Sequence, residues 1–186
     1  MQLIEKILVK CKVWRWELLS LKLRNHKWEY AVLALDWELN KDLGTVSIVC
    51  DKKEKFWLIK NYRVGVNNLC YEMVRWALEK NLSIEENAIK EVEEELNITW
   101  KPTSIKILSK ACGDTGLVSG FVYYVFLQYD DLTKFDVWWQ TKDFYEWIVE
   151  RVLVNKKEFE NMIRSWEIID NFTLSAYSLL KVNNLI

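Results

Sequence analysis

The sequence SIEENAIKEVEEELN, from Ser83 to Asn97, combines a helical pattern with a dense cluster of acidic residues. Ser83 and Glu86 have the spacing of a capping box, in which each side chain accepts a hydrogen bond from a backbone N–H at the helix start. Asn97 stands where the chain leaves the helix, a position at which asparagine tolerates the left-handed conformation. Apolar side chains recur at three- and four-residue intervals and predict one buried stripe on a helix from Ser83 to Leu96: Ile84, Ala88, Ile89, Val92 and Leu96.

Glutamates crowd this helix, at positions 85, 86, 91, 93, 94 and 95. Glu91, Glu94 and Glu95 stand at i, i+3 and i+4, so we expect them to project from one face beside the apolar stripe. Like charges at this spacing repel one another, whereas a bound divalent cation would reverse that effect. Mg²⁺ prefers carboxylate oxygens and keeps positions open for waters and phosphate oxygens. The same spacing also fits an ordinary solvated acidic face, so both interpretations remain open at this point.

Strand-like runs lie on both sides of this helix, and two further helices are predicted at Lys156–Arg164 and Thr173–Val182. This order predicts an α/β fold, in which a mixed sheet lies between helices and carries an N-terminal antiparallel strand pair. The predicted strands are Val13–Leu23, Trp28–Leu35, Gly44–Cys50, Phe56–Ile59, Ser104–Leu108, Phe121–Leu127 and Trp147–Val154.

Length and composition exclude several classes of protein. The chain has 186 residues and a formal net charge of −1 at pH 7. This length, without repeats or a linker, predicts a single domain over residues 1–186. A net charge near zero, with no basic stripe, argues against binding of nucleic acid through its phosphates. No signal peptide or membrane-length apolar run is visible, so we expect a cytoplasmic protein that does not enter the membrane and whose four cysteines are free thiols.

The run from Tyr71 to Ile98 resembles the Nudix box, a glycine-led loop followed by a helix that carries Arg-Glu-x-x-Glu-Glu. Here residues 90–95 read KEVEEE. Residues 56–63, FWLIKNYR, look like the strands that lead to the family's Gln-Tyr-Arg motif. Residues 167–176, EIIDNFTLSA, are similar to the Gly-x-Ile-x-Asp-x-x-Thr segment of ADP-ribose pyrophosphatases. The resemblance covers nearly the whole chain and implies a Nudix fold of the ADP-ribose and nucleotide-sugar branch.

The resemblance also implies roles for individual residues. In the family the three helix glutamates hold one or more Mg²⁺ or Mn²⁺ ions, and the matching residues are Glu91, Glu94 and Glu95, with Glu94 also assigned to catalysis. Arg63 ends the strand motif and is expected to bind a substrate phosphate through its planar fork. Glu72, which stands where the family has Glu-Leu-Pro or Glu-Phe-Pro, is a further candidate for substrate binding.

Two other roles fall on the loop before the last strand and on the N-terminal strands. In the ADP-ribose branch an acidic loop often provides the base that activates water, and Asp143 and Glu146 fall in that loop, with Asp136 farther away. We predict Glu146 as the base. The alternative is that Glu146 is an ordinary acidic residue of a surface loop.

In the family the N-terminal strands swap across a dimer and place an aromatic ring on the nucleobase. Residues 1–40 are therefore expected to mediate a homodimer, and Trp28 to stack on the base unless it only packs in its strand.

Five positions depart from the family pattern. The leading glycine of the box is Trp76, the glutamate six residues later is Leu82, the arginine is Lys90 and the closing glycine is Asn97. In the loop after the helix, Gly120 replaces an acid. In the family the glutamate and arginine are thought to pair, so Leu82 and Lys90 are expected to remove a brace between loop and helix. Tryptophan resists backbone geometry that glycine permits, so the loop near Trp76 is expected to be rebuilt.

Two classes of function remain. The first is metal-dependent hydrolysis of a nucleoside diphosphate derivative at its diphosphate linkage, acting on ADP-ribose, a nucleotide sugar or a related nucleotide. Nucleoside triphosphates are a variant of this substrate class. The second is a catalytically impaired protein that binds a nucleotide as a sensor or interaction module, which Trp76, Leu82 and Gly120 favour. The retained glutamates favour the first.

Overall fold

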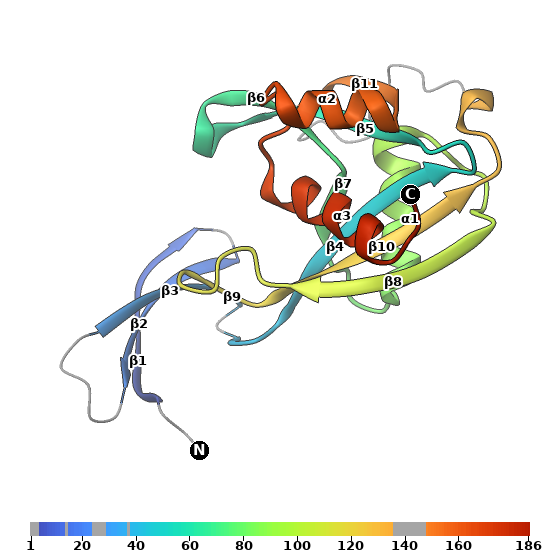
Figure 1. The fold of residues 1–186 in the computed structure, drawn as a ribbon. Coiled ribbons are helices and arrows are strands. Elements are labelled where there is room, and N and C mark those ends of the chain that lie inside the picture. Colours follow the sequence, from blue (N-terminus) through green and yellow to red (C-terminus); the bar gives the residue numbers. More distant parts are fainter. Residues whose placement is uncertain (1–3, 14, 24–28, 37, 136–147) are drawn as a thin grey trace. The chain divides into compact units, whose positions relative to one another are not determined.

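The structure is a computed structural model that describes residues 4–13, 15–23, 29–36, 38–135 and 148–186 (Figure 1). These residues form two compact units. The first comprises Met1–Leu43 and Lys110–Val122, and the second comprises Gly44–Ser109 and Tyr123–Ile186. The single domain predicted over residues 1–186 stays a prediction.

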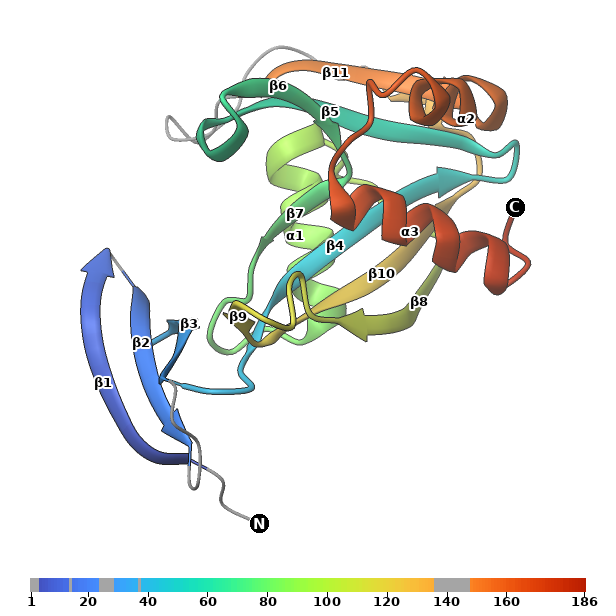
Figure 2. The same ribbon diagram turned by 60° about the vertical axis from the view of Figure 1, so that its left-hand side comes forward.

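The first unit contains a four-stranded sheet with the order β1-β2-β3-β9. Strands β1 (Ile4–Val13), β2 (Trp16–Leu23) and β3 (Glu29–Leu35) run antiparallel to their neighbours, while β9 (Val118–Ser119) pairs parallel with β3 (Figure 2). The predicted antiparallel pair is present as β2 and β3. The prediction of one strand from Val13 to Leu23 is wrong, because Val13 ends β1 and pairs with Trp16 across a tight turn. No glycine or proline marks that turn, so the sequence pattern runs through it.

The second unit contains a seven-stranded sheet. Its main path has the order β11-β5-β4-β10-β8, and two short strands, β6 and β7, pair with β5 and β4 respectively. The β6 and β7 strands follow a short 3₁₀ helix, and neither strand was predicted from the sequence. The bounds of the strands are Asp42–Asp51 for β4, Lys55–Arg63 for β5, Asn68–Glu72 for β6, Val74–Ala77 for β7, Ser104–Ala111 for β8, Phe121–Tyr129 for β10 and Ile148–Asn155 for β11. Those of the 3₁₀ helices are Val64–Val66 for η1 and Leu132–Lys134 for η2.

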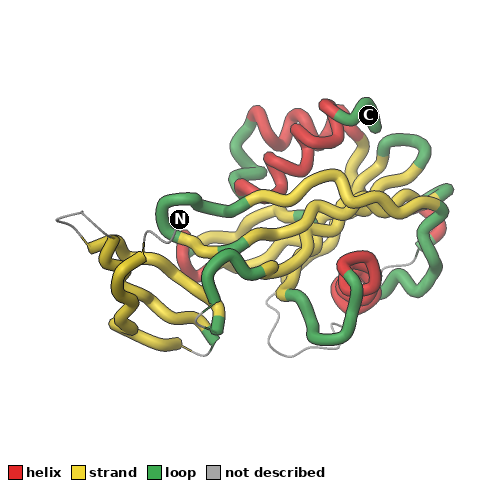
Figure 3. Tube along the Cα trace, turned by 90° about the horizontal axis from the view of Figure 1, so that it is seen from below, coloured by secondary structure: helices red, strands yellow, loops and turns green. Residues whose placement is uncertain are grey.

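Helices flank this second sheet on both sides (Figure 3). Helix α1 (Ile84–Leu96) packs on one face, where its Ala88, Val92 and Leu96 join a core with side chains of β4, β5, β7 and β10. Helices α2 (Lys156–Arg164) and α3 (Asn171–Val182) follow β11. The ring of Phe159 in α2 lies 5.4 Å from that of Phe56 in β5 and stacks on Tyr177 of α3. The predicted α/β fold with a mixed sheet between helices is confirmed.

Two further expectations concern the thiols and the membrane. Cys50 and Cys70 are buried free thiols, as expected, and burial raises the pKa of Cys50 to about 12. Cys112 is also free but only half-buried. Among the described residues, no helix is both long enough and apolar enough to cross a membrane.

Candidate functional site

Helix α1 has the capped geometry that its sequence predicts. Ser83 accepts a hydrogen bond from Glu86 N at 3.1 Å, and the Glu86 carboxylate accepts one from Ser83 N at 2.8 Å. Asn97 ends the helix in the left-handed region, with φ 56° and ψ 30°. Two buried hydrogen bonds fix the helix to the sheet, from Asn87 Nδ2 to Thr45 Oγ1 at 3.1 Å and from Ser47 Oγ to Ala88 O at 3.3 Å. The acidic helix is therefore held in a defined rotation against β4.

That rotation gives the three glutamates different exposure to solvent. Glu91 is 1% exposed and Glu95 is 3% exposed, whereas the side chain of Glu94 is 39% exposed. The three glutamates, which were predicted to share one face beside the apolar stripe, therefore differ in their exposure to solvent. Glu91 and Glu95 are four residues apart and lie on the buried side of the helix with Val92 and Leu96. Ionised carboxylates are costly to bury unless cations or hydrogen bonds compensate them, so the surroundings of this pair are a candidate functional site.

Glu94 is tied to its own helix. Lys90 Nζ lies 3.0 Å from Glu94 Oε1 and 2.5 Å from Glu79 Oε1. The hydrogen bond to Glu79, followed by that to Glu94, raises the pKa of the Lys90 ammonium, although burial opposes the shift. Among the described residues, no three acidic, thiol or imidazole side chains come close enough together to hold a metal ion.

The contact between Lys90 and Glu79 also corrects an expectation. Leu82 and Lys90 were expected to leave the loop without a brace, but Lys90 pairs with Glu79 in that same loop. The backbone N–H of Glu79 donates to Asn87 Oδ1 at 3.0 Å, which ties the loop to the helix a second time. The brace is thus rebuilt three residues earlier in the chain, with the positive charge still on the helix.

Trp76 does not distort the loop in the way that its replacement of a glycine suggested. It lies in β7 opposite Thr45, and its φ is not positive, so its backbone is that of an ordinary strand. The close backbone approach falls on the partner strand instead. A Cβ added at Gly44 would overlap the carbonyl oxygen of Trp76. The glycine that this pairing requires is therefore in β4, and the tryptophan side chain is 44% exposed.

Gly120 has a structural requirement of its own in the first unit. Its φ is +144°, and a Cβ added there would lie 2.5 Å from Lys41 O and 2.6 Å from Leu43 Cγ. Gly120 also precedes Phe121, whose backbone N–H donates to Lys41 O at 2.9 Å. An acid at this position is incompatible with that geometry.

Arg63 and Glu72 form the centre of a polar network at the β5–β6 pair. Glu72 is 0% exposed and accepts hydrogen bonds from Arg63 Nε at 2.7 Å and Arg63 Nη2 at 2.5 Å. Arg75 of β7 donates from Nε to Glu72 Oε2 at 3.1 Å, and its Nη2 lies 3.3 Å from Asp170 Oδ1. Asp170 caps α3 by accepting from Thr173 N at 2.9 Å. Glu72 therefore contacts arginines and does not reach solvent.

The arginine network and the buried end of α1 share one electrostatic environment. Hydrogen bonds to Glu72 raise the pKa of Arg63, and the charges of Glu72, Asp170 and Glu95 raise it further, while burial opposes the shift. Arg151 of β11 donates to the backbone carbonyl of Glu95. The structure thus brings Arg63, Glu72 and Glu95 into one region of the second unit.

Several predicted residues lie outside the described part of the chain. Trp28, the predicted stacking residue, is one of them, and Glu146, the predicted base, is another, as are the alternatives Asp136 and Asp143. Their roles stay predictions. Arg75 lies in no motif and was not predicted as a site residue. The alternation of β7 does carry a signal, because Val74 packs on the α1 side and Arg75 must point to the other.

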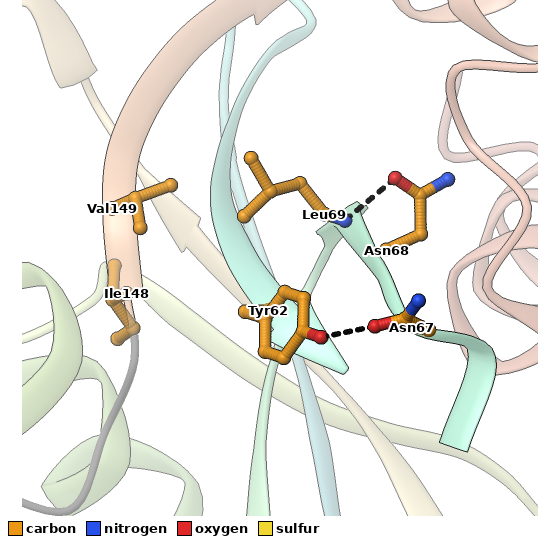
Figure 4. Close-up of a pocket in the computed structure, with 6 residues that line it drawn as sticks. All are labelled: Tyr62, Asn67, Asn68, Leu69, Ile148 and Val149. Atoms are coloured by element: carbon orange, nitrogen blue, oxygen red, sulfur yellow. Dashed lines mark hydrogen bonds between the residues drawn. The ribbon is translucent and has the colours of Figure 1, made fainter. Parts of the chain in front are cut away.

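A cavity of about 600 Å³ lies near the C-terminal end of β5, at the starts of β6 and β11 (Figure 4). Tyr62 donates a hydrogen bond to Asn67 Oδ1, and Asn68 Oδ1 accepts one from Leu69 N at 2.8 Å. Neither the α1 glutamates nor the arginines line this cavity. Its lining residues are Tyr62, Asn67, Asn68, Leu69, Ile148 and Val149.

Comparisons with known proteins show the fold. No protein-family model matches the sequence, and no curated protein matches it. A solved structure described as "Crystal structure of ADP compounds hydrolase" is similar, with a TM-score of 0.72 and 14% sequence identity. The match covers 96% of this chain and 91% of that chain. At this identity the likeness establishes the fold alone, and the chain has a Nudix-like fold.

Proposed function

We propose that this protein hydrolyses the diphosphate linkage of a nucleoside diphosphate derivative with the help of Mg²⁺ or Mn²⁺. The observation that carries the proposal is the burial of Glu91 and Glu95, one helical turn apart on α1, together with the charge of Glu95, which raises the pKa of Arg63. Two buried carboxylates could bind the cation of a metal–diphosphate complex, and a partly exposed arginine could bind its anion. A solvated acidic helix face would leave Glu91 and Glu95 exposed.

The donor set suits a magnesium-type ion. Mg²⁺ is commonly bound by one or two carboxylates, with waters and substrate phosphates completing its coordination. Glu91 and Glu95 would supply those carboxylates. Glu94 would join them only after leaving Lys90, since its carboxylate lies 3.0 Å from that ammonium. The residues present therefore fit a two-carboxylate site more directly than the three-carboxylate site predicted from the sequence.

Each residue would then have a distinct task. A bound divalent ion would stabilise negative charge on the phosphate and make a coordinated water more acidic. Arg63 would hold a phosphate oxygen through N–H groups that Glu72 does not use. Glu72, which is fully buried, would position Arg63 and would not contact the substrate. Glu146 remains our candidate for the base that takes the proton from water.

The substrate class is supported by the similar solved structure, whose description as an ADP compounds hydrolase concerns that protein. We extend it to this chain as a proposal and include ADP-ribose, nucleotide sugars and related nucleotides. Trp28 would stack on the base, and residues 1–40 would form a homodimer. Light scattering tests the dimer, and a monomeric mass would contradict it.

The decisive experiment is a cleavage assay over ADP-ribose, nucleotide sugars and nucleoside triphosphates with Mg²⁺ or Mn²⁺. We expect Glu91→Gln and Glu95→Gln to reduce turnover at least about 100-fold, because loss of a residue that only supports a ligand already costs 10–100-fold. Glu85→Gln, in the first turn of the same helix, should keep wild-type activity. Absence of turnover on every substrate, or full activity in both variants, would refute the proposal.

The pairing of Glu94 with Lys90 favours a second candidate function, the binding of a nucleotide without cleavage. If Glu94 stays on Lys90, the metal set is incomplete relative to the three-glutamate pattern of the Nudix box. Calorimetry followed by analysis of the recovered ligand separates the two functions. Tight binding with the nucleotide recovered intact supports the binding module, and multiple turnover excludes it.

A further inference from the structure

We propose that Arg75 and Arg63 together form a diphosphate clamp, with the buried Glu72 as the positioning residue that holds both guanidinium groups. The inference rests on the proposed function and deepens it, since it assigns a second phosphate-binding arginine and a reason for choosing diphosphates. We call Arg63, Arg75 and Glu72 together the diphosphate clamp.

The two arginines share one oxygen of the same carboxylate. Arg63 Nη2 lies 2.5 Å from Glu72 Oε2, and Arg75 Nε lies 3.1 Å from that same atom. Their guanidinium groups are therefore close neighbours, although they come from different strands. Because Glu72 is 0% exposed, it cannot turn toward solvent and release them.

Arg75 is also fixed from the other side. Its Nη2 lies 3.3 Å from Asp170 Oδ1, and its guanidinium carbon lies 4.8 Å from the centre of the Phe172 ring. Asp170 is itself immobilised because it accepts hydrogen bonds from Thr173 N at 2.9 Å and Thr173 Oγ1 at 2.8 Å. Ring stacking and two carboxylates set the plane of the guanidinium before any ligand arrives.

Both arginines keep donors for a ligand. The side chain of Arg63 is 35% exposed and that of Arg75 is 25% exposed. An arginine offers N–H donors from Nε, Nη1 and Nη2, and the contacts with described residues use only Nε and Nη2 of each side chain. As far as the described residues are concerned, the Nη1 groups and the second N–H of each Nη2 remain for an anion.

The charge pattern selects the kind of anion. Two guanidinium groups on one carboxylate oxygen repel each other, and an anion that contacts both relieves that repulsion. A diphosphate has two adjacent phosphoryl groups, so it can offer one set of oxygens to each planar fork. A single phosphate has fewer oxygens to share between the two forks, so we expect it to use fewer of their donors. The clamp therefore favours diphosphates over monophosphates.

The test measures binding of inorganic pyrophosphate and of orthophosphate by calorimetry, with and without Mg²⁺. We expect Arg75→Gln to weaken pyrophosphate binding about tenfold, because the loss of a hydrogen bond to a charged group lowers affinity by about this factor. Orthophosphate binding should weaken less. Arg75→Lys should weaken pyrophosphate binding similarly, because lysine keeps the charge but loses the fork. With a nucleotide substrate, KM should rise while kcat is retained.

Arg164→Gln provides the matched control. Arg164 also pairs with a glutamate, Glu160 at 3.2 Å, but it lies on α2 and is 66% exposed. This variant should bind pyrophosphate like the wild type. Thermal melting of each variant shows whether it folds, and Arg75→Lys decides the question if Arg75→Gln does not fold.

The outcomes separate this inference from the proposed function. Wild-type pyrophosphate affinity in folded Arg75 variants, or a wild-type protein that binds no pyrophosphate, overturns the clamp. In the first case hydrolysis can still be observed and the proposed function stands. Conversely, a wild-type protein that cleaves no nucleotide but loses pyrophosphate affinity on Arg75→Gln supports the clamp and contradicts the proposed function.

Discussion

Lys90 of α1 and Glu79 of the preceding loop form an ion pair, with Nζ 2.5 Å from Oε1. The same ammonium lies 3.0 Å from Glu94 Oε1, so one lysine joins the loop to the helix and also occupies a candidate metal ligand. The pair replaces the brace between loop and helix that Leu82 and Lys90 were expected to remove. It also sets up a competition between Lys90 and a divalent cation for Glu94.

Removal of Lys90 should release Glu94. We expect Lys90→Gln to increase Mg²⁺ affinity several-fold, because Glu94 no longer has to leave a cation and the local positive charge is gone. Stability should fall by no more than about 1 kcal/mol, since both side chains of the Lys90–Glu79 pair are more than a third exposed. Metal titration by calorimetry, with the exposed Lys80→Gln as control, measures the effect. Unchanged or weaker Mg²⁺ binding would show that Glu94 takes no part in the metal site.

Metal binding should appear as thermal stabilisation. A ligand that binds only the folded state, at about 100 times its Kd, adds about 2.7 kcal/mol to the free energy of unfolding. We expect Mn²⁺ or Mg²⁺ to raise the Tm of the wild type, and Glu91→Gln and Glu95→Gln to lose most of that increase. Melting curves over a metal series provide the measurement, with Glu85→Gln as the control. An equal rise in Tm in all four proteins would place the ion elsewhere.

Substitution at Gly120 should destabilise the protein. Its φ of +144° is strained for any residue with a Cβ, and that atom would come within 2.5 Å of Lys41 O. We expect Gly120→Ala to lower stability by about 1–3 kcal/mol, and Gly120→Glu, which restores the family's acid, by at least as much. Gly65→Ala is the control, because no atom lies within 4 Å of a Cβ at that position. Urea unfolding midpoints compare the three variants, and a neutral Gly120→Glu would contradict the geometry.

Glu160 should make the protein sensitive to acid. Its hydrogen bond from Tyr177 and its contacts with Lys181 and Arg164 hold the pKa of its carboxyl at about 2, below its ordinary value of 4.5. A carboxyl whose pKa is lower in the folded state stabilises it above the unfolded pKa. That contribution is then lost as the pH falls from about 4.5 to about 2.

The variants Glu160→Gln and Tyr177→Phe test this dependence. Both should flatten the fall in Tm between pH 5 and pH 2, Glu160→Gln the more strongly because it removes the titrating group itself. Thermal melts at a series of pH values give the slopes. If Tm falls with pH as steeply in both variants as in the wild type, the acid sensitivity comes from other carboxyl groups.

Local sequence patterns predict helix α1 and the approximate positions of most of the longer strands. The capping box at Ser83, the apolar stripe and the left-handed Asn97 are local features, since each depends on residues within a few positions. The same is true of α2, whose predicted bounds Lys156–Arg164 match those observed. The turn after Val13 and the short strands β6 and β7 escaped prediction because no glycine or proline marks their ends.

Burial of the acidic residues and their pairing with basic residues became visible only in the tertiary structure. The spacing of Glu91, Glu94 and Glu95 is the same whichever side of the helix faces the sheet. Packing against β4 turns Glu91 and Glu95 inward and leaves Glu94 to Lys90. Likewise, Arg75 meets Asp170 only because β7 packs beside the start of α3. Periodicity fixes the relative positions of residues within one element, whereas burial and ion pairing depend on packing between elements that are distant in the sequence.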